Sequence, residues 1–190
     1  MDSLQIDKEI KFLQEQIKEN REKIVVLRSR RKPEEIEDYV FKTKEGKNIS
    51  LSEMFGDKNE LIVIHNMGKS CRYCTLWADG INGFTDHFEN RAGFVVISPD
   101  FYEEMNEFAA SRNWNFKIYS AKENSFKKDL GYKTEEGFIP GVSVLIKNSD
   151  GKILHYSNEE FGPGDDYCSL WHFFELLPNG SDGWAPNYRY

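Results

Sequence analysis

The chain has 190 residues, of which 39% are hydrophobic and 14% aromatic, and its formal net charge is −7. This composition is typical of a globular protein, excludes an intrinsically disordered chain, and argues against nucleic acid or an anionic membrane as the main partner. We expect a cytoplasmic protein, because the polar N-terminus has no signal peptide, no apolar stretch reaches the roughly 20 residues that span a bilayer, and three cysteines do not suit a secreted disulfide scaffold.

Residues 1–32 are predicted to form a strongly charged amphipathic helix that Pro33 ends. Isoleucines and leucines recur in a narrow stripe near heptad spacing, which Arg21 interrupts. The stripe indicates either docking onto the rest of the chain or pairing with a second copy in a homodimer. The basic cluster at 28–32 is better explained by the helix dipole than by a nucleic-acid contact. The stripe consists of Ile6, Ile10, Leu13, Ile17, Ile24 and Leu27.

After this helix the sequence predicts a hairpin, a helical turn and a βαβ unit. Leu61 to Ile64 is a short β-branched run typical of an interior strand, and a helix and a second buried strand follow it. Such a unit is expected to be parallel and right-handed. The predicted elements are a hairpin at 39–51, a turn at 52–55, strands at 61–66 and 94–98, and a helix of roughly 72–90 whose apolar face carries Cys74, Trp77, Ile81, Phe84 and Phe88.

The second half of the chain continues the alternation of strands and helices. Asp100 is the predicted N-cap of a helix that runs through Arg112, and Gly131 is expected to stop a short helix. The pattern predicts an α/β fold with a mixed central sheet flanked by helices. The remaining elements are a strand at 116–119, a helix at 125–130, a hairpin of 142–146 with 153–156, a last helix with Leu170, Phe173, Phe174 and Leu177, and a surface tail from 178 to 190.

Two cysteines, Cys71 and Cys74, lie where the predicted strand turns into the predicted helix, with Arg72 and Tyr73 between them. Unpaired N–H groups and the helix dipole stabilise a thiolate at a helix N-terminus, and Arg72 adds a positive charge. Two intervening residues let the sulfur atoms approach bonding distance within the first helical turn. The arrangement predicts a dithiol that cycles with its disulfide.

Three other interpretations of this cysteine pair are weaker. The strand-to-helix context disfavours two structural cysteines, and a cytosolic setting disfavours a permanent disulfide. A zinc site would need Cys168 and a histidine as further ligands, and no second CxxC or HxxxH follows at zinc-finger spacing. We therefore expect no metal and no cofactor. The four histidines are His65, His87, His155 and His172.

The order of the elements is that of a thioredoxin-like fold, which we assign to residues 33–190, after the N-terminal helix. Ile139-Pro140-Gly141 leads straight into the first strand of the late hairpin. Thioredoxin-like proteins carry a cis-proline loop there, facing the dithiol. By that analogy we assign Pro140 to the active site and expect a cis peptide bond before it, rather than a trans proline that starts a strand.

A family resemblance is carried by the charged N-terminal helix and by the segments 38–41, 71–80 and 139–144, of which Trp77-Ala78-Asp79-Gly80 is the most specific. These segments resemble a bacterial thioredoxin-like family of unassigned function, the domain of unknown function eight-nine-nine, and the resemblance covers most of the chain. It implies a dithiol–disulfide oxidoreductase related to peroxiredoxins. The Cys-Arg-Tyr-Cys sequence departs from the Cys-Gly-Pro-Cys of thioredoxins, so the reductant or oxidant direction stays open.

Each candidate residue receives a predicted role. Cys71 is the nucleophile because it is nearer the helix start and the solvent, and Cys74, one turn further on the apolar face, is the resolving thiol. Arg72 would stabilise the thiolate. We expect Cys168 to be a small buried hydrophobic residue, with a third redox thiol as the alternative. We expect His65 to be a satisfied histidine at a strand end, with a general base or metal ligand as the alternative.

The sequence thus predicts a thiol–disulfide oxidoreductase that acts on a disulfide-containing protein or small molecule, with an electron donor that the sequence does not name. A thiol peroxidase is less favoured, because peroxiredoxins place a threonine three residues before the reactive cysteine and Gly68 stands there in this chain. The alternative from another class is a non-catalytic thioredoxin-like binding module with structural cysteines.

Overall fold

The computed structural model describes residues 2–190. Contacts between residues divide the chain into two compact units, the first ending at Pro33 and the second spanning Glu34–Tyr190. The first unit is a single helix, α1 (Ser3–Arg30), which buries none of its residues. Its start is capped by Asp2, whose carboxylate accepts a hydrogen bond of 2.8 Å from the backbone N–H of Gln5.

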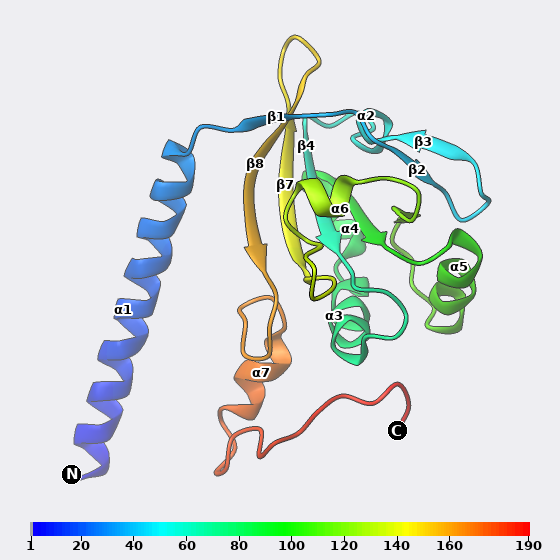
Figure 1. The fold of residues 1–190 in the computed structure, drawn as a ribbon. Helices are drawn as coiled ribbons and strands as arrows, with labels where there is room; N and C mark the ends of the chain where they lie inside the picture. The colour runs from blue at the N-terminus through cyan, green and yellow to red at the C-terminus, as the bar shows by residue number, and fades with distance from the viewer. Residues whose placement is uncertain (1) are drawn as a thin grey trace. The chain divides into compact units, whose positions relative to one another are not determined.

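The second unit is built on one eight-stranded sheet with the strand order β1-β8-β7-β4-β5-β6-β2-β3 (Figure 1). β4, β5 and β6 run parallel, whereas the other neighbours are antiparallel, so the sheet is mixed as predicted. The strands are β1 (Glu34–Ile36), β2 (Val40–Lys42), β3 (Asn48–Ser50), β4 (Glu60–His65), β5 (Gly93–Ser98), β6 (Ile118–Ser120), β7 (Gly141–Lys147) and β8 (Ile153–Glu160).

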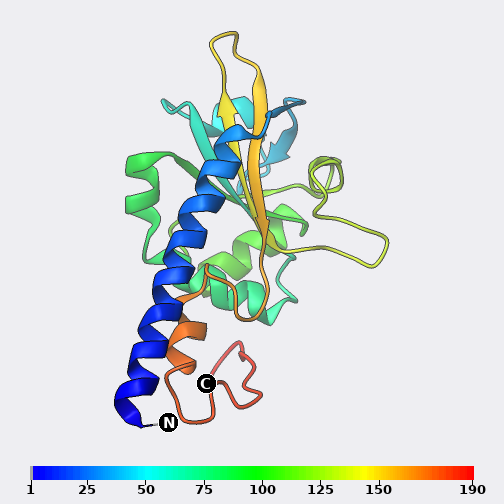
Figure 2. The same cartoon turned by 90° about the vertical axis from the view of Figure 1, so that its left-hand side faces the viewer.

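Helices pack on both faces of the sheet (Figures 1 and 2), and each face has its own hydrophobic cluster. Alternate strand residues point to opposite faces, so Ile64 joins the cluster beneath α3 and α5, while Val63 joins the cluster beneath α2 and α6. The helices are α2 (Leu51–Met54), α3 (Arg72–Asn82), α4 (Thr85–Arg91), α5 (Tyr102–Ser111), α6 (Phe126–Asp129) and α7 (Ser169–Phe174).

The helix predicted for 72–90 is wrong in one respect, because the chain forms two helices there. α3 ends at the C-cap Gly83, and the backbone N–H of Phe84 donates to the carbonyl of Ile81 in the connecting turn. The turn rotates the following residues away from the core face. Phe84, predicted to be buried, is therefore 55% exposed, whereas Phe88 still packs against the core.

Two further local predictions are also wrong. The N-cap of α5 is Phe101, because the Asp100 carboxylate instead accepts hydrogen bonds from Ser98 and from the backbone of Lys69. The last helix ends at Phe174, so Leu177 lies beyond it and is exposed. The helical spacing of hydrophobic residues continues to Leu177, beyond the end of the helix, so the spacing overestimated the helix length.

Candidate active site

The two cysteines lie at the carboxyl end of β4, in the centre of the sheet. Cys71 is the N-cap residue of α3, and its sulfur accepts a hydrogen bond of 3.1 Å from the backbone N–H of Cys74. Cys71 is partly exposed, whereas Cys74 is buried, with 3% of its surface accessible. Both are free thiols. One sulfur therefore faces solvent at a helix start while the other lies one turn deeper.

The surroundings stabilise the thiolate form of Cys71. Its pKa is lowered from 9.0 to about 7, first by a hydrogen bond from the Cys74 thiol and then by backbone N–H groups of Cys74 and Tyr73, with burial acting in the opposite direction. Arg72, which we expected to stabilise this thiolate, is exposed and is not among the causes. Hydrogen bonds supply the lowering of the Cys71 pKa, and the role of Arg72 stays a prediction.

The Cys74 thiol is held in its protonated form. Its hydrogen bond to Cys71 and its burial both raise the pKa of Cys74, and the hydrogen bond of 3.4 Å from the backbone N–H of Met67 offsets only part of this. The two thiols thus share one proton between an acidic and a basic sulfur. This asymmetry is what a nucleophile and a resolving thiol require.

The loop that joins β4 to α3 is fixed by polar contacts. Asn66 accepts a hydrogen bond of 2.6 Å from the backbone N–H of Gly68, and Asp100 accepts one of 2.7 Å from that of Lys69. Gly68 has a positive φ of 101°, and a Cβ atom there would lie 2.8 Å from the Asp100 carboxylate. The loop therefore requires glycine at position 68. The carbonyl of Gly68 accepts a hydrogen bond from the backbone N–H of Cys71.

Pro140 lies beside the dithiol, but its predicted cis peptide bond is wrong. The Ile139–Pro140 bond is trans, which is the lower-energy form for X–Pro. Proline fits directly before β7 because it has no N–H to pair, and its carbonyl accepts a hydrogen bond of 2.9 Å from Phe161. Pro140 and Cys74 share the lining of a small cavity of about 10 Å³, so Pro140 shapes the inner side of the site.

The other candidate residues have packing roles. His65 is fully buried, its Nε2 lies 3.0 Å from the Ser143 hydroxyl, and its ring stacks on Tyr132 at 3.6 Å. Burial lowers the pKa of His65, so it stays neutral. Its Nδ1 has no hydrogen-bond partner among the described residues, so the ring is only half satisfied. Cys168 is buried as predicted, and burial raises the pKa of its thiol.

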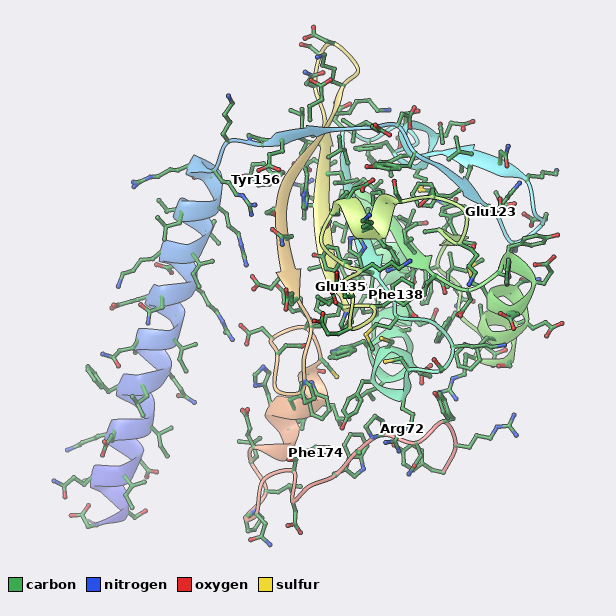
Figure 3. All side chains as sticks on the ribbon, in the orientation of Figure 1. Arg72, Glu123, Glu135, Phe138, Tyr156 and Phe174 are labelled. Atoms are coloured by element: carbon green, nitrogen blue, oxygen red, sulfur yellow. The ribbon has the colours of Figure 1, made fainter. Side chains whose placement is uncertain are left out.

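Two residues near the dithiol had no signal in the sequence. Lys127 on α6 is buried, and its ammonium group interacts electrostatically with Cys74. Tyr188 in the C-terminal tail lies close enough to Cys71 and Arg72 for their charges to act on it, and Figure 3 shows Arg72 beside this tail. Burial, followed by the Cys71 charge, raises the pKa of Tyr188. The tail thus borders the exposed side of the site.

Neither a metal cluster nor a membrane segment accompanies this dithiol in the described part of the chain. Within residues 2–190, the His, Cys, Asp and Glu side chains form no group of three that could hold a metal ion. None of the described helices is both long and apolar enough to cross a membrane.

Comparison with known proteins places the fold. The family model described as "Bacterial protein of unknown function (DUF899)" matches residues 3–189. No curated protein matches the chain. The fold resembles solved peroxiredoxin structures that have the thioredoxin fold.

Three of these structures show the extent of the likeness. Peroxiredoxin Q of Xanthomonas campestris has a TM-score of 0.56 at 15% identity, covering 65% of this chain and 80% of that one. The peroxidoxin BcpB of Mycobacterium tuberculosis gives 0.56 at 16%, covering 72% and 88%. A cysteine-to-serine mutant of Xylella fastidiosa PrxQ gives 0.58 at 13%, covering 70% and 87%. At these identities the likeness establishes the fold alone, and it confirms the predicted thioredoxin-like architecture.

Proposed function

We propose that this chain, which belongs to the DUF899 family of bacterial proteins of unknown function, is a thiol–disulfide oxidoreductase that cycles Cys71 and Cys74 between dithiol and disulfide. One observation carries the proposal. A partly exposed thiol with a pKa of about 7 is hydrogen-bonded to a buried thiol whose pKa is raised. Structural cysteines have no need of this asymmetry, whereas an exchange reaction uses it directly.

The proposed reaction begins with attack of the Cys71 thiolate on one sulfur of a substrate disulfide. A new S–S bond joins Cys71 to that sulfur, and the other substrate sulfur leaves as a thiolate that takes up a proton. Cys74 then loses its proton and attacks the Cys71 sulfur, which releases the second substrate thiol. The substrate gains two electrons, the protein forms the Cys71–Cys74 disulfide, and an electron donor restores the dithiol.

Trapping of the mixed disulfide tests this scheme. Cys74→Ser removes the resolving thiol, so this variant should accumulate a covalent adduct with a small disulfide, which mass spectrometry of the intact protein detects. Cys71→Ser should form no adduct, and Cys168→Ser, which changes a buried thiol outside the pair, should cycle like the natural protein. Unreactive thiols in all forms would contradict the scheme and favour the binding-module interpretation.

A thiol peroxidase is the second candidate, since the similar solved structures include peroxiredoxins. A Cys71 thiolate at neutral pH could attack a hydroperoxide, but Gly68 stands where peroxiredoxins have a threonine. The two activities differ in their first product. In the presence of dithiothreitol as electron donor, the reduced protein should consume hydrogen peroxide no faster than dithiothreitol alone consumes it. Rapid consumption that Cys71→Ser abolishes would establish the peroxidase instead.

A further inference from the structure

A pocket of about 490 Å³ opens at the end of the sheet where the parallel strands finish, which is also the end that carries the dithiol. Its wall includes Pro99, directly after β5, and Ala121, directly after β6. β4, β5 and β6 are parallel neighbours, so their carboxyl ends lie side by side at a spacing of about 4.8 Å between strands. The pocket and the dithiol loop after β4 therefore lie at the same end of the sheet, the carboxyl ends of its parallel strands. Ligands of α/β proteins generally bind at this end.

The pocket is strongly basic in a chain that is acidic overall. Its wall carries four lysines. Among residues 2–190, none of these lysines forms an ion pair with a carboxylate. The single acidic residue of the wall, Glu123, lies 3.9 Å from Lys42 outside the pocket. Figure 3 labels Glu123 and Phe138, which lie in the segments before α6 and before β7. The lysines are Lys122, Lys127, Lys128 and Lys133.

Lys127 sets this cluster apart from an ordinary solvated surface. It is 3% exposed, and its Nζ has no hydrogen-bond partner among the described residues. The Nζ lies 6.0 Å from the centre of the Phe138 ring, and Lys133 lies 5.5 Å from the same ring. An unpaired buried ammonium group costs several kcal/mol when it is charged. An anion bound beside Phe138 would supply the missing charge.

The wall of the pocket is also connected to the dithiol. Lys127 interacts electrostatically with Cys74. Phe138 lies in the pocket wall, and Pro140, two residues further along, lines the small cavity beside Cys74. One segment of the chain thus contributes Phe138 to the pocket wall and Pro140 to the small cavity beside Cys74.

We propose that this pocket binds the carboxylates of an anionic small-molecule disulfide that the dithiol reduces. The volume lies within the range of small-molecule sites, about 300–1,000 Å³. The inference rests on the proposed oxidoreductase function and names its substrate class. The chemical step is the exchange described above: one substrate S–S bond breaks, the Cys71–Cys74 bond forms, and the two substrate sulfurs leave as thiols.

Three disulfides of different charge test the inference on the reduced full-length protein. Glutathione disulfide is anionic, 2-hydroxyethyl disulfide is neutral and cystamine is cationic. The rate of dithiol oxidation by each, divided by the rate of the same disulfide with free dithiothreitol, removes differences in intrinsic reactivity. We expect the anionic disulfide to exceed the neutral one by about tenfold at low salt and the cationic one to be slowest. The advantage should shrink as sodium chloride is added.

A matched pair of variants locates the effect. Lys122→Gln combined with Lys133→Gln should lower the anionic-to-neutral rate ratio by about tenfold. Lys152→Gln removes a lysine charge that pairs with Glu35 beside the β7–β8 turn, at the opposite end of the parallel strands, and should leave the ratio unchanged. Equal normalised rates for the three disulfides, or a ratio that the double variant does not change, would overturn the inference. Failure of even the neutral disulfide to oxidise the dithiol would instead overturn the proposed function.

Discussion

At the scale of single residues, the site depends on two sulfurs with opposite surroundings. The largest cause of the low pKa of Cys71 is the hydrogen bond from Cys74, not a neighbouring cation. In the proposed reaction, the nucleophile therefore depends on the thiol that later resolves its product. This coupling gives the first prediction.

Alkylation of Cys71 by iodoacetamide should rise with pH through a midpoint of about 7, because only the thiolate reacts. Cys74→Ala removes the main hydrogen-bond donor, so the midpoint should move toward the ordinary value of 9.0. Cys168→Ser is the control and should leave the midpoint in place. A natural protein that alkylates with a midpoint near 9.0, or a Cys74→Ala variant with an unchanged midpoint, would show that these contacts do not set the reactivity.

Lys127 should make stability depend on pH. Burial lowers its pKa from 10.5 to about 7, so between these values the folded state binds fewer protons than the unfolded state. The free energy of unfolding contributed by this group therefore rises with pH across that window, and the cost of burying the charge is complete below pH 7. Charges on Cys74 and Asp100 act on Lys127 in the opposite direction and reduce the shift.

Lys127→Met should thus stabilise the protein by roughly 3–5 kcal/mol at pH 6 and by much less at pH 10, measured by urea unfolding. Lys128→Met changes the exposed neighbour on the same helix and should alter stability by less than about 0.5 kcal/mol at both pH values. Equal effects of Lys127→Met at the two pH values would mean that the ammonium is not buried in its charged form. A stability cost retained by the natural chain is consistent with a ligand-binding role.

The sequence identified Cys71 and Cys74 because a spacing of two residues at a strand-to-helix junction is a local signal. It gave no sign of Lys127, whose burial depends on Phe138 returning over α6 from a later part of the chain. The trans bond at Pro140 was missed for a similar reason, because the analogy supplied the position of the loop but not the path of its backbone.

At the scale of elements, the β4–α3 loop positions the dithiol through one glycine. Gly68→Ala would combine a positive φ of 101° with a contact of 2.8 Å to the Asp100 carboxylate, which itself holds the backbone of Lys69. We expect a loss of about 1–3 kcal/mol in denaturant unfolding. Gly56→Ala is the matched control, since Gly56 has a φ of 58° and open space around it. A Gly68→Ala variant that loses no more stability than the control would show that the contact with Asp100 is easily relieved.

The helix α1 carries the prediction about assembly. Its stripe residues are all exposed, and an isolated helix with an apolar stripe is only marginally stable in water. We propose that α1 pairs with α1 of a second copy. Deletion of residues 1–32 should halve the mass measured by light scattering. Monomers both with and without the helix would contradict the pairing.

Periodicity predicted the elements that bury a continuous face, above all β4 and α3. It failed where the spacing continued past a turn, as at Phe84, which the break at Gly83 leaves exposed. β1 was not predicted at all, because only its last residue is even partly buried and its partner β8 lies more than a hundred residues away. Local pattern cannot report a pairing of that range.

At the scale of the whole second unit, the topology explains why the site lies where it does. β4 lies between β5, which runs parallel to it, and β7, which runs antiparallel. The connection from β4 to β5 packs α3 on one face of the sheet, while the connection from β6 to β7 packs α6 on the other. These two connections therefore cover opposite faces of the sheet. Both the dithiol and the basic pocket lie between them, at the carboxyl ends of the parallel strands.

The central claim is that Cys71 and Cys74 form a reversible redox pair, and one measurement tests it most directly. The protein is equilibrated in glutathione buffers of increasing oxidised fraction, its remaining thiols are alkylated, and the intact mass is recorded. We predict a single transition in which Cys71 and Cys74 lose their thiols together, with Cys168 alkylated throughout, and full reversal on adding dithiothreitol. Loss of one thiol without the other, a disulfide that includes Cys168, or no transition at any buffer composition would contradict the account.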